Sequence, residues 1–232
     1  MKRYRSLWLM FLAFNVFAGA ATAQQITSPY RYVEEKQSLG AYVGTLSTDG
    51  GSLGLGPQSG TFFGLRYNIV LGGPFVIEAD LGYFPSTRDV FTTDTAAVPS
   101  DSIAPVRTRV GEADVAIITA LASLRFNLTG QRTWHRLMPY IVFGGGTAFD
   151  VTGDVDAAEG VPPAAVVDFG TSFAGSLGAG VEWFATRRLG VRAEFRDLLW
   201  QVETPDAFLG GKVPADEWVQ NLTFTVGGSY HF

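Results

Sequence analysis

The sequence predicts an all-β protein folded as an eight-stranded antiparallel up-and-down transmembrane β-barrel. Segments in which every second residue is apolar recur along the chain, and a period of two is typical of strands. The connections between these segments alternate between short and long. Aromatic residues stand near both ends of the apolar faces, where a membrane-spanning strand carries its aromatic belts. Together these observations predict a barrel that crosses a membrane.

The first 23 residues have the pattern of a cleaved signal peptide. A basic head at residues 2–5 precedes an apolar run, and an A-x-A cleavage site ends at Ala23. An uncleaved membrane anchor is the alternative. Asn15 interrupts the apolar run, which is also shorter than the roughly 20 residues of a spanning helix. We therefore predict a signal peptide at residues 1–23, a periplasmic leader at residues 24–37 and one barrel domain at residues 38–232.

Four strands are expected in the first half of the barrel. Ser38–Thr48 is the weakest, because glycines interrupt its pattern. Ser59–Leu71 alternates aromatic and aliphatic residues with polar ones such as Arg66. Phe75–Phe84 alternates apolar residues with two acids, and Glu112–Asn127 ends in S-L-R-F-N, in which the two apolar residues share a face. Alternation of this kind indicates one apolar and one polar face in each strand.

Four more strands are expected in the second half. Met138–Asp150 contains a glycine triplet that leaves its apolar face undefined. Thr171–Phe184 and Leu189–Trp200 alternate apolar residues with glycines or charges. Trp218–Phe232 is the clearest strand, because its even-numbered residues are almost all apolar and its odd-numbered ones small and mostly polar. Its length exceeds the roughly 9–11 residues that a tilted strand needs to cross a bilayer.

The lengths of the connections give the predicted orientation. Short turns are expected at Gly72–Pro74 and Ala185–Arg188, with an intermediate one at Leu128–Leu137. Membrane barrels of bacteria have short periplasmic turns and long external loops. Both termini are therefore expected on the periplasmic side. The longer connections, expected on the outside, are Asp49–Gln58, Pro85–Gly111, Val151–Gly170 and Glu203–Glu217.

Composition limits the function classes. The chain has 17 basic and 22 acidic residues, and loss of the three basic residues of the signal leaves 14 against 22, a net charge near −8. This balance argues against a nucleic-acid partner, which requires basic patches. The chain has no cysteine, which excludes disulfides and a lipid-modified cysteine. We expect no cofactor and no metal.

Aromatic residues near the strand ends predict that lipid covers the apolar face. A soluble, lipocalin-like barrel is the alternative, because charges usually mark the solvated face of a sheet. Tyrosine and tryptophan favour membrane–water interfaces, since one edge of the ring is polar and the rest apolar. The expected aromatic girdle consists of Tyr67, Tyr83, Tyr140, Trp183, Trp200, Trp218 and Tyr230.

Lipid on the outside makes the charged face the lumen. A turn centred at Gly72 would place Arg66 opposite Glu78, and a turn centred at Arg187 would place Glu182 opposite Arg192. Eight strands leave an interior only just wide enough for side chains. We therefore expect an ion-pair network that fills the lumen, with four arginines and four acids: Arg66, Glu78, Asp80, Arg125, Glu182, Arg192, Glu194 and Arg196.

The chain resembles the small eight-stranded outer-membrane barrels of the OmpA/OmpX/OmpW type over roughly Ser38–Phe232. The resemblance is carried by S-L-R-F-N at 123–127, P-Y-I and the glycine triplet at 139–146, G-A-G-V-E-W at 178–183, and the terminal Tyr230-His231-Phe232. It implies a place in the Gram-negative outer membrane, in contact with lipopolysaccharide and phospholipid. It also implies that the barrel assembly machinery reads Tyr230 and Phe232 as a C-terminal signal. We expect a monomer without a periplasmic peptidoglycan-binding domain.

Catalytic candidates are few. His135 and His231 are too far apart in the sequence to indicate a metal site. Some barrels of this kind are lipid A deacylases with a His-Ser-Glu set on the lipid-facing wall, but Ser229 and His231 share the inward face. The acidic segment 150–156 resembles a calcium loop without its glycine and its bidentate glutamate, and a solvated loop is the simpler interpretation.

We therefore expect a non-enzymatic outer-membrane barrel of structural or interaction type. The alternative is a narrow, OmpW-like channel or transporter for small or hydrophobic solutes. The two differ in the lumen, because a transporter needs a gap in the ion-pair network or an apolar pocket that opens sideways.

Overall fold

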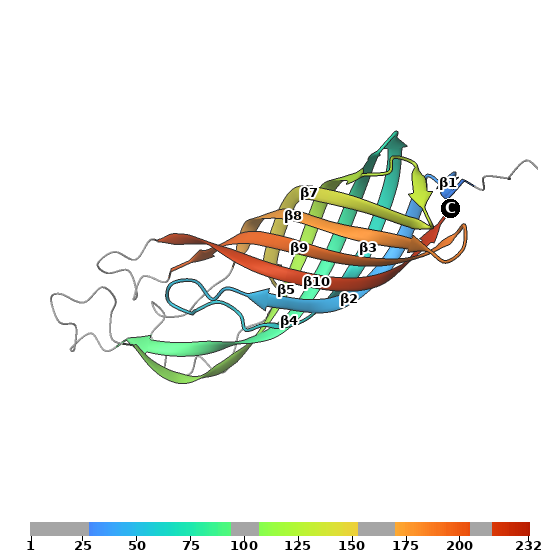
Figure 1. Cartoon of the computed structure of the whole chain (residues 1–232). Helices are drawn as coiled ribbons and strands as arrows, with labels where there is room; N and C mark the ends of the chain where they lie inside the picture. The colour runs from blue at the N-terminus through green and yellow to red at the C-terminus, as the bar shows by residue number, and fades with distance from the viewer. Residues whose placement is uncertain (1–27, 94–106, 153–169, 205–214) are drawn as a thin grey trace, which may run out of the picture.

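The structure is a computed structural model that describes residues 28–93, 107–152, 170–204 and 215–232. The predicted signal peptide lies outside the described residues. The described residues form ten strands (Figure 1). No helix among the described residues is long and apolar enough to cross a membrane. The strands are β1 (Tyr30–Tyr32), β2 (Gln37–Thr48), β3 (Gly60–Gly72), β4 (Phe75–Thr93), β5 (Arg107–Asn127), β6 (Arg132–Trp134), β7 (Leu137–Asp150), β8 (Thr171–Phe184), β9 (Leu189–Glu203) and β10 (Asp216–His231).

Eight of these strands close into an antiparallel barrel, as predicted. Strands β2, β3, β4, β5, β7, β8, β9 and β10 each pair with the next, and β10 pairs with β2. The paired residues can be traced from strand to strand around the barrel, starting at Ser38 of β2. The trace returns to β2 at Thr48, ten residues further along the strand. This stagger tilts the strands by about 40° and leaves room only for side chains inside. The ladder passes through Ser38, Asn68, Glu78, Ser123, Gly144, Ser176, Leu198, Asn221 and Thr48.

The two ends of the barrel differ. Strand β1, the C-terminus and the short β3–β4 and β8–β9 turns lie at one end, here called the terminal end (Figure 1). The connection from β2 to β3 lies at the other end, here called the loop end, together with the strand ends that precede and follow residues 94–106, 153–169 and 205–214. This matches the expected alternation of short and long connections.

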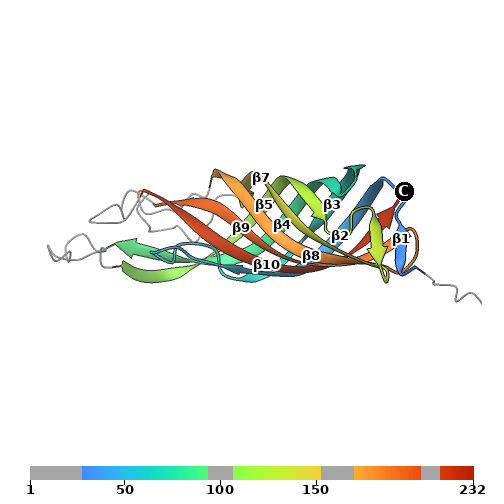
Figure 2. The same cartoon turned by 45° about the horizontal axis from the view of Figure 1, so that its top comes forward.

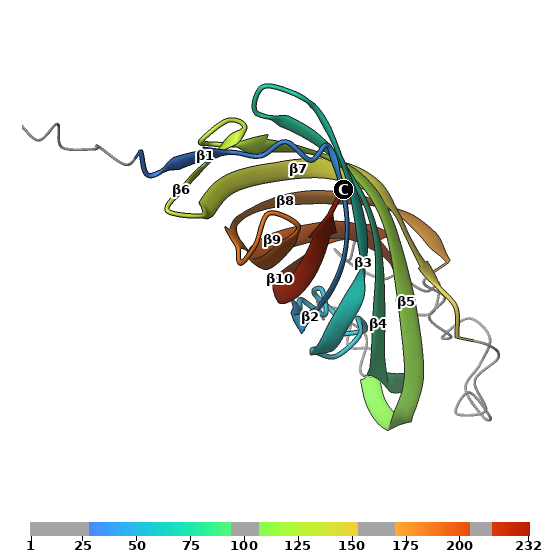
Figure 3. The same cartoon turned by 90° about the vertical axis from the view of Figure 1, so that its right-hand side faces the viewer.

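The leader is a strand at the terminal end, which the sequence did not predict. Strand β1 pairs antiparallel with β6, with Tyr30 opposite Trp134. The leader then runs on to β2, beside the C-terminus (Figure 3). There the amide of Phe232 donates to the carbonyl of Gln37 at 2.9 Å, and the amide of Gln37 donates back at 3.2 Å. Both β1 and β6 have three residues, too few to show an alternation.

Strands β4 and β5 extend beyond the predicted ends. We expected a loop over Pro85–Gly111, but β4 continues to Thr93 and β5 begins at Arg107. Strand β3 pairs with β4 only as far as Tyr83, so Pro85 lies where β4 pairs with β5 alone. Proline has no backbone N–H to donate, and it is tolerated there because no neighbouring strand lies on that side to accept a hydrogen bond. The result is a two-stranded ribbon that projects from the loop end (Figure 2).

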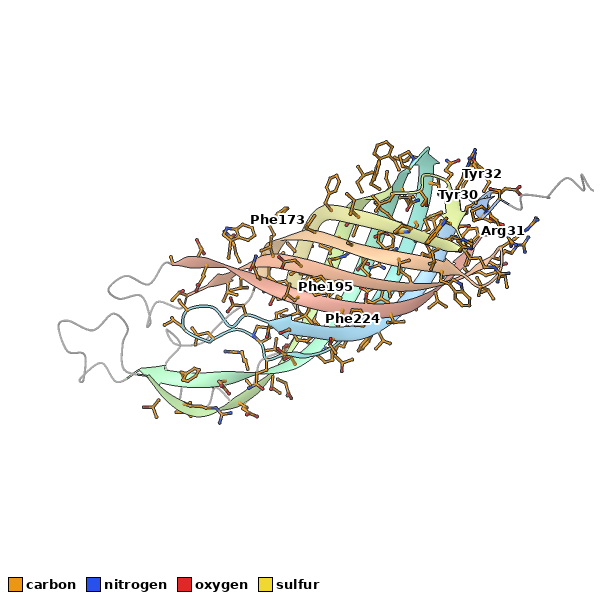
Figure 4. The ribbon with its side chains drawn as sticks, in the orientation of Figure 1. Tyr30, Arg31, Tyr32, Phe173, Phe195 and Phe224 are labelled. Atoms are coloured by element: carbon orange, nitrogen blue, oxygen red, sulfur yellow. The ribbon has the colours of Figure 1, made fainter. Side chains whose placement is uncertain are left out.

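Apolar side chains cover the outer wall of the barrel. Phe173, Phe195 and Phe224 are more than half exposed and lie on the outside of the barrel (Figure 4). Among the expected girdle residues, Trp183, Trp218 and Tyr230 are exposed at 44%, 53% and 46%. Tyr67 and Tyr83 are half-buried and alternate with buried neighbours, so they also face outward. An exposed apolar wall of this extent is typical of a surface that contacts lipid.

The girdle prediction is wrong for Tyr140 and Trp200. Both face the interior, where their side chains are 1% and 2% exposed. In β7 the even-numbered residues point inward, a parity that the glycine triplet concealed in the sequence. In β9, Trp200 has the same parity as the inward arginine at position 192. Aromatic character at a strand end was therefore not sufficient to indicate contact with lipid.

Tryptophan quenching by brominated lipid should separate the two kinds of tryptophan. In single-tryptophan variants refolded into vesicles, Trp183 and Trp218 should be quenched strongly, because they lie on the outer wall. Trp200 should keep most of its fluorescence, since the barrel wall separates it from the acyl chains. Equal quenching of Trp200 and Trp218 would contradict the inward placement of Trp200.

Candidate functional site

The barrel interior has two layers along its axis. From the terminal end towards the loop end, the inward residues of β9 change from Arg192, Glu194 and Arg196 to Leu198 and Trp200. The eight predicted lumen residues lie in the terminal half, all buried, and form the charged layer. The loop half is an apolar layer, which contains Leu46, Phe62, Phe84, Val115, Ile117, Ala148, Ala174, Leu198, Trp200, Val202 and Val219.

Glu78 lies at the centre of the charged layer and is fully buried. Its carboxylate is 2.6 Å from Arg192 Nη1 and 3.1 Å from Arg196 Nη2. Arg66 Nε and Arg125 Nη1 are further away, at 3.6 and 3.9 Å. One buried carboxylate therefore faces four guanidinium groups, and its charge stabilises all of them.

Glu194 is the second shared carboxylate. It contacts Arg192 at 2.5 Å, Arg66 at 2.8 Å and Arg196 at 3.0 Å. Asp80 receives a hydrogen bond from Arg66 Nε at 2.7 Å. Because most arginines bridge two carboxylates, the contacts link β3, β4 and β9 across the lumen.

A smaller cluster around Glu182 lies nearer the terminal end. Arg125 Nη2 donates to Glu182 at 2.8 Å, and Ser229 Oγ donates to it at 2.7 Å. His231 Nε2 lies 3.0 Å from the same carboxylate. Arg125 also lies 3.9 Å from Glu78, so this cluster adjoins the first one.

The predicted register of the β3–β4 hairpin is wrong by two residues. Arg66 pairs with Asp80, and Asn68 stands opposite Glu78. The turn residues are Gly73 and Pro74, and a bulge at Leu71 adds one unpaired residue, so the paired residues are centred on Gly73 and not on Gly72. Arg66 still reaches Glu78 diagonally at 3.6 Å.

The predicted register of the β8–β9 hairpin is correct, with Glu182 opposite Arg192. Their shortest ion-pair contacts are nevertheless not with each other. Glu182 contacts Arg125, whereas Arg192 contacts Glu78 and Glu194. Position across a ladder alone did not predict these partners.

Two interior tyrosines complete the charged layer and were not identified from the sequence. Tyr42 Oη donates to Asp80 at 2.7 Å, and Tyr140 Oη donates to Glu194 at 2.9 Å. The guanidinium groups of Arg125 and Arg192 lie 4.0 and 4.3 Å from the centre of the Tyr140 ring. For Tyr42 the alternation within β2 was the signal available in the sequence, whereas the glycine triplet of β7 concealed the parity of Tyr140.

Each interior tyrosine lies across a glycine of the neighbouring strand. Tyr42 pairs with Gly64, and Tyr140 pairs with Gly180. A Cβ atom on Gly180 would lie 2.2 Å from Tyr140 Oη and 2.7 Å from the carbonyl oxygen of Ala193. Glycine therefore makes room for the ring inside a narrow barrel.

Replacing Gly180 with alanine should destabilise the barrel by about 1–3 kcal/mol, because the added methyl group displaces Tyr140 from Glu194. Gly175→Ala, in the same strand, is the matched control, since its Cβ would meet only Leu199 Cβ at 3.9 Å. Urea unfolding in lipid vesicles measures both variants. Equal destabilisation by the two substitutions would show that strand propensity, and not the tyrosine contact, is responsible.

The remaining candidates do not form a site of familiar chemistry. His231 Nε2 contacts both Ser229 Oγ at 3.1 Å and Glu182 Oε1 at 3.0 Å, whereas a catalytic triad places serine and acid on opposite ring nitrogens. His135 packs against Trp134 in the turn between β6 and β7. No group of three metal-binding side chains occurs in the described part of the chain, and the acids at 154 and 156 lie outside it.

The chain is similar in fold to a solved outer membrane protein. At 14% identity, 88% of the chain matches 99% of the outer membrane protein OprG from Pseudomonas aeruginosa, with a TM-score of 0.54. The E. coli outer membrane protein W matches with 15% identity, coverage of 85% and 98%, and a TM-score of 0.48. Neisserial surface protein A is 14% identical to the chain, with 88% of this chain and 98% of that protein covered and a TM-score of 0.45. No curated protein sequence matches significantly. The outer membrane protein β-barrel domain family matches residues 9–232, so the chain belongs to this family of transmembrane barrels.

Proposed function

We propose that the protein is a structural or interaction component of the bacterial outer membrane whose lumen is closed by the charged layer. The observation that carries this proposal is the shared burial of Glu78 and Glu194 among four arginines drawn from three strands. Such a layer spans the lumen and holds the opposite walls together. The barrel then acts as a rigid support for its loops.

The cavities next to the layers support a closed lumen. A cavity of 40 Å³ lies at the terminal side, beside Arg125, Glu182 and His231. Another of 10 Å³ lies beside Ile117 and Trp200 in the apolar layer. Cavities of this size hold one or a few water molecules and no solute.

In the proposed orientation, the terminal end faces the periplasm and the loop end faces the outside. Trp183 and Tyr230 would then mark the inner interface, and Trp218 and Tyr83 the outer one. Lipopolysaccharide and phospholipid would cover the wall between them, and the protein would act as a monomer. The assembly machinery of the outer membrane would recognise Tyr230 and Phe232.

The loop end offers an acidic surface for contacts. Among the residues of this end whose side chains the structure describes, there are seven acids and two arginines, Arg88 and Arg109. Arg109 pairs with Asp89 at 2.8 Å and also with Glu112, so acidic side chains remain in excess at this end. A basic or cation-bridged partner is therefore favoured. The acids are Asp49, Asp89, Glu112, Asp114, Asp150, Asp216 and Glu217.

Planar-bilayer recording tests the closed lumen. The refolded protein should give no discrete conductance steps, because buried ion pairs close the cross-section. Stable steps in the unmodified protein would contradict the proposal and support a narrow channel.

The apolar layer could also serve a transporter of hydrophobic solutes, and uptake of a hydrophobic solute into proteoliposomes tests this alternative. Uptake above that of protein-free liposomes would support a transporter.

A further inference from the structure

A pocket of 590 Å³ lies at the terminal end, outside both interior layers. It lies between the leader, the turn from β6 to β7 and the turn from β8 to β9, the segments that face the viewer in Figure 3. The leader contributes residues 31–35, and Figure 4 labels Arg31 and Tyr32 there. Thr133 of β6, Phe184 at the end of β8, and the turn residues Arg136 and 185–187 complete the lining.

The pocket carries charges of both signs. Arg31, Arg136 and Arg187 line it together with Glu34 and Glu35. Within the described residues, no ion pair involves any of these five side chains. Guanidinium groups bind phosphate through paired hydrogen bonds, and carboxylates accept hydrogen bonds from a primary ammonium group. A ligand that contains both groups would satisfy both sets of side chains.

The backbone of one turn supports a binding role for Arg136. His135 and Arg136 have positive φ angles of 49° and 69°. A turn of this kind is usually formed by Asn-Gly, because other side chains are strained in the left-handed region. Two hydrogen bonds hold the turn: His135 N donates to Pro29 O at 3.0 Å, and Phe184 N donates to Arg136 O at 2.9 Å. The fold thus keeps an arginine at the pocket where glycine would be less strained.

The depth of the pocket matches a lipid headgroup. Trp183 lies on the outer wall directly before the lining residues Phe184–Arg187. Exposed tryptophan at the end of a spanning strand lies at headgroup level. Val33, Phe184 and Ala185 give the pocket an apolar side as well.

We propose that this pocket binds the phosphoethanolamine headgroup of a phospholipid. Arg31, Arg136 and Arg187 hold the phosphate, and Glu34 and Glu35 hold the ammonium group. The inference rests on the placement of the barrel in a membrane and not on the closed lumen. A conducting barrel would therefore leave it intact.

Competition between lipids tests the headgroup. Purified barrel is equilibrated in micelles with equal amounts of dioleoyl phosphatidylethanolamine, phosphatidylcholine and phosphatidylglycerol, and retained lipid is measured by native mass spectrometry. Phosphatidylethanolamine should be retained preferentially, because choline has no N–H donor and glycerol has no ammonium group. Equal retention of the three lipids would overturn the proposal, and a preference for phosphatidylglycerol would replace it with a simple anion site.

Neighbouring arginines provide a matched pair of variants. Arg187→Ala should reduce retained phosphatidylethanolamine by roughly tenfold, the loss expected for one charge-assisted contact. Arg188→Ala removes the same charge from the same turn, but Arg188 lies outside the pocket lining and its hydrogen bond goes to Tyr230 Oη at 3.4 Å. It should leave retention unchanged. Equal losses in both variants would indicate surface charge alone and overturn the proposed site.

Two further variants separate binding from folding. Glu34→Gln combined with Glu35→Gln should abolish the preference for phosphatidylethanolamine over phosphatidylglycerol. His135→Asn combined with Arg136→Gly should relax the turn, so the barrel should unfold at a higher urea concentration while retaining less phosphatidylethanolamine. Unchanged retention in this relaxed variant would overturn the role of Arg136, and a folding defect cannot explain a loss in a more stable protein.

Discussion

Glu78→Ala should unfold the barrel at a much lower urea concentration than the unmodified protein. Four arginines face this carboxylate, and the closest lies 2.6 Å away. Removing it leaves their positive charges buried with three other acids to balance them. Breaking a buried ion pair costs about 3–5 kcal/mol, and water that enters the lumen would reduce this value. We therefore expect a loss of unfolding free energy at or just below this range.

Glu112→Ala is the control for charge removal in general. Glu112 pairs with Arg109 on the loop-end ribbon, where both side chains are about half exposed. An exposed pair of this kind contributes about 1 kcal/mol or less. Urea unfolding in vesicles should therefore separate the two glutamates clearly.

A double-mutant cycle with Arg192→Ala then isolates the contact between Glu78 and Arg192. The double variant should lose less unfolding free energy than the sum of the two single losses. Each single change leaves the other charged side chain buried without this partner, whereas the double change removes both charges. A coupling energy near zero would show that the charged layer is hydrated and that its ion pairs do not hold the walls together.

Deletion of Phe232 should reduce the amount of barrel in the outer membrane far more than it reduces the stability of the refolded protein. The deletion removes the two backbone hydrogen bonds to Gln37 and the stacking of Phe232 on Tyr230, with ring centres 6.2 Å apart. Full burial of such a side chain is worth about 1.5–3 kcal/mol, and Phe232 is 53% exposed. The barrel should therefore still refold in detergent.

The expected loss in cells follows from recognition by the assembly machinery, which is our proposal for Tyr230 and Phe232. A chain that is not recognised remains in the periplasm and is degraded. Refolding yield and outer-membrane abundance should be measured together, with Phe232→Tyr as the control that keeps a terminal aromatic ring. Normal abundance of the deletion variant would reject recognition. A parallel fall in yield and abundance would assign the effect to stability.

Alternation of apolar residues was sufficient to predict the barrel strands. The bounds of β8 are those predicted, and β10 differs by two residues at its start and one at its end. The end of β4 was missed because Pro85 usually stops a strand, and only the tertiary structure shows that its side of β4 has no partner at that point. A sequence read locally does not contain this information.

The interior was harder to predict than the wall. The identity of the charged residues followed from parity, but their contacts depend on a bulge at Leu71 and on side chains that cross the lumen, such as Arg192 to Glu78. Trp200 and Tyr140 were misplaced because aromatic rings serve both as membrane anchors and as filling for a narrow barrel. Burial distinguishes the two roles, and burial is a property of the whole ring of strands.

The seam between β2 and β10 has a consequence for how the chain folds. It joins Ser38 to His231, so the barrel closes only through a contact that spans nearly the entire sequence. Contacts of such separation require a large loss of chain entropy before they form, and folding is correspondingly slow. Until that moment β2 and β10 both present unpaired edges, which can join other chains and aggregate. Protection of these two edges during transit is therefore a kinetic requirement of this topology.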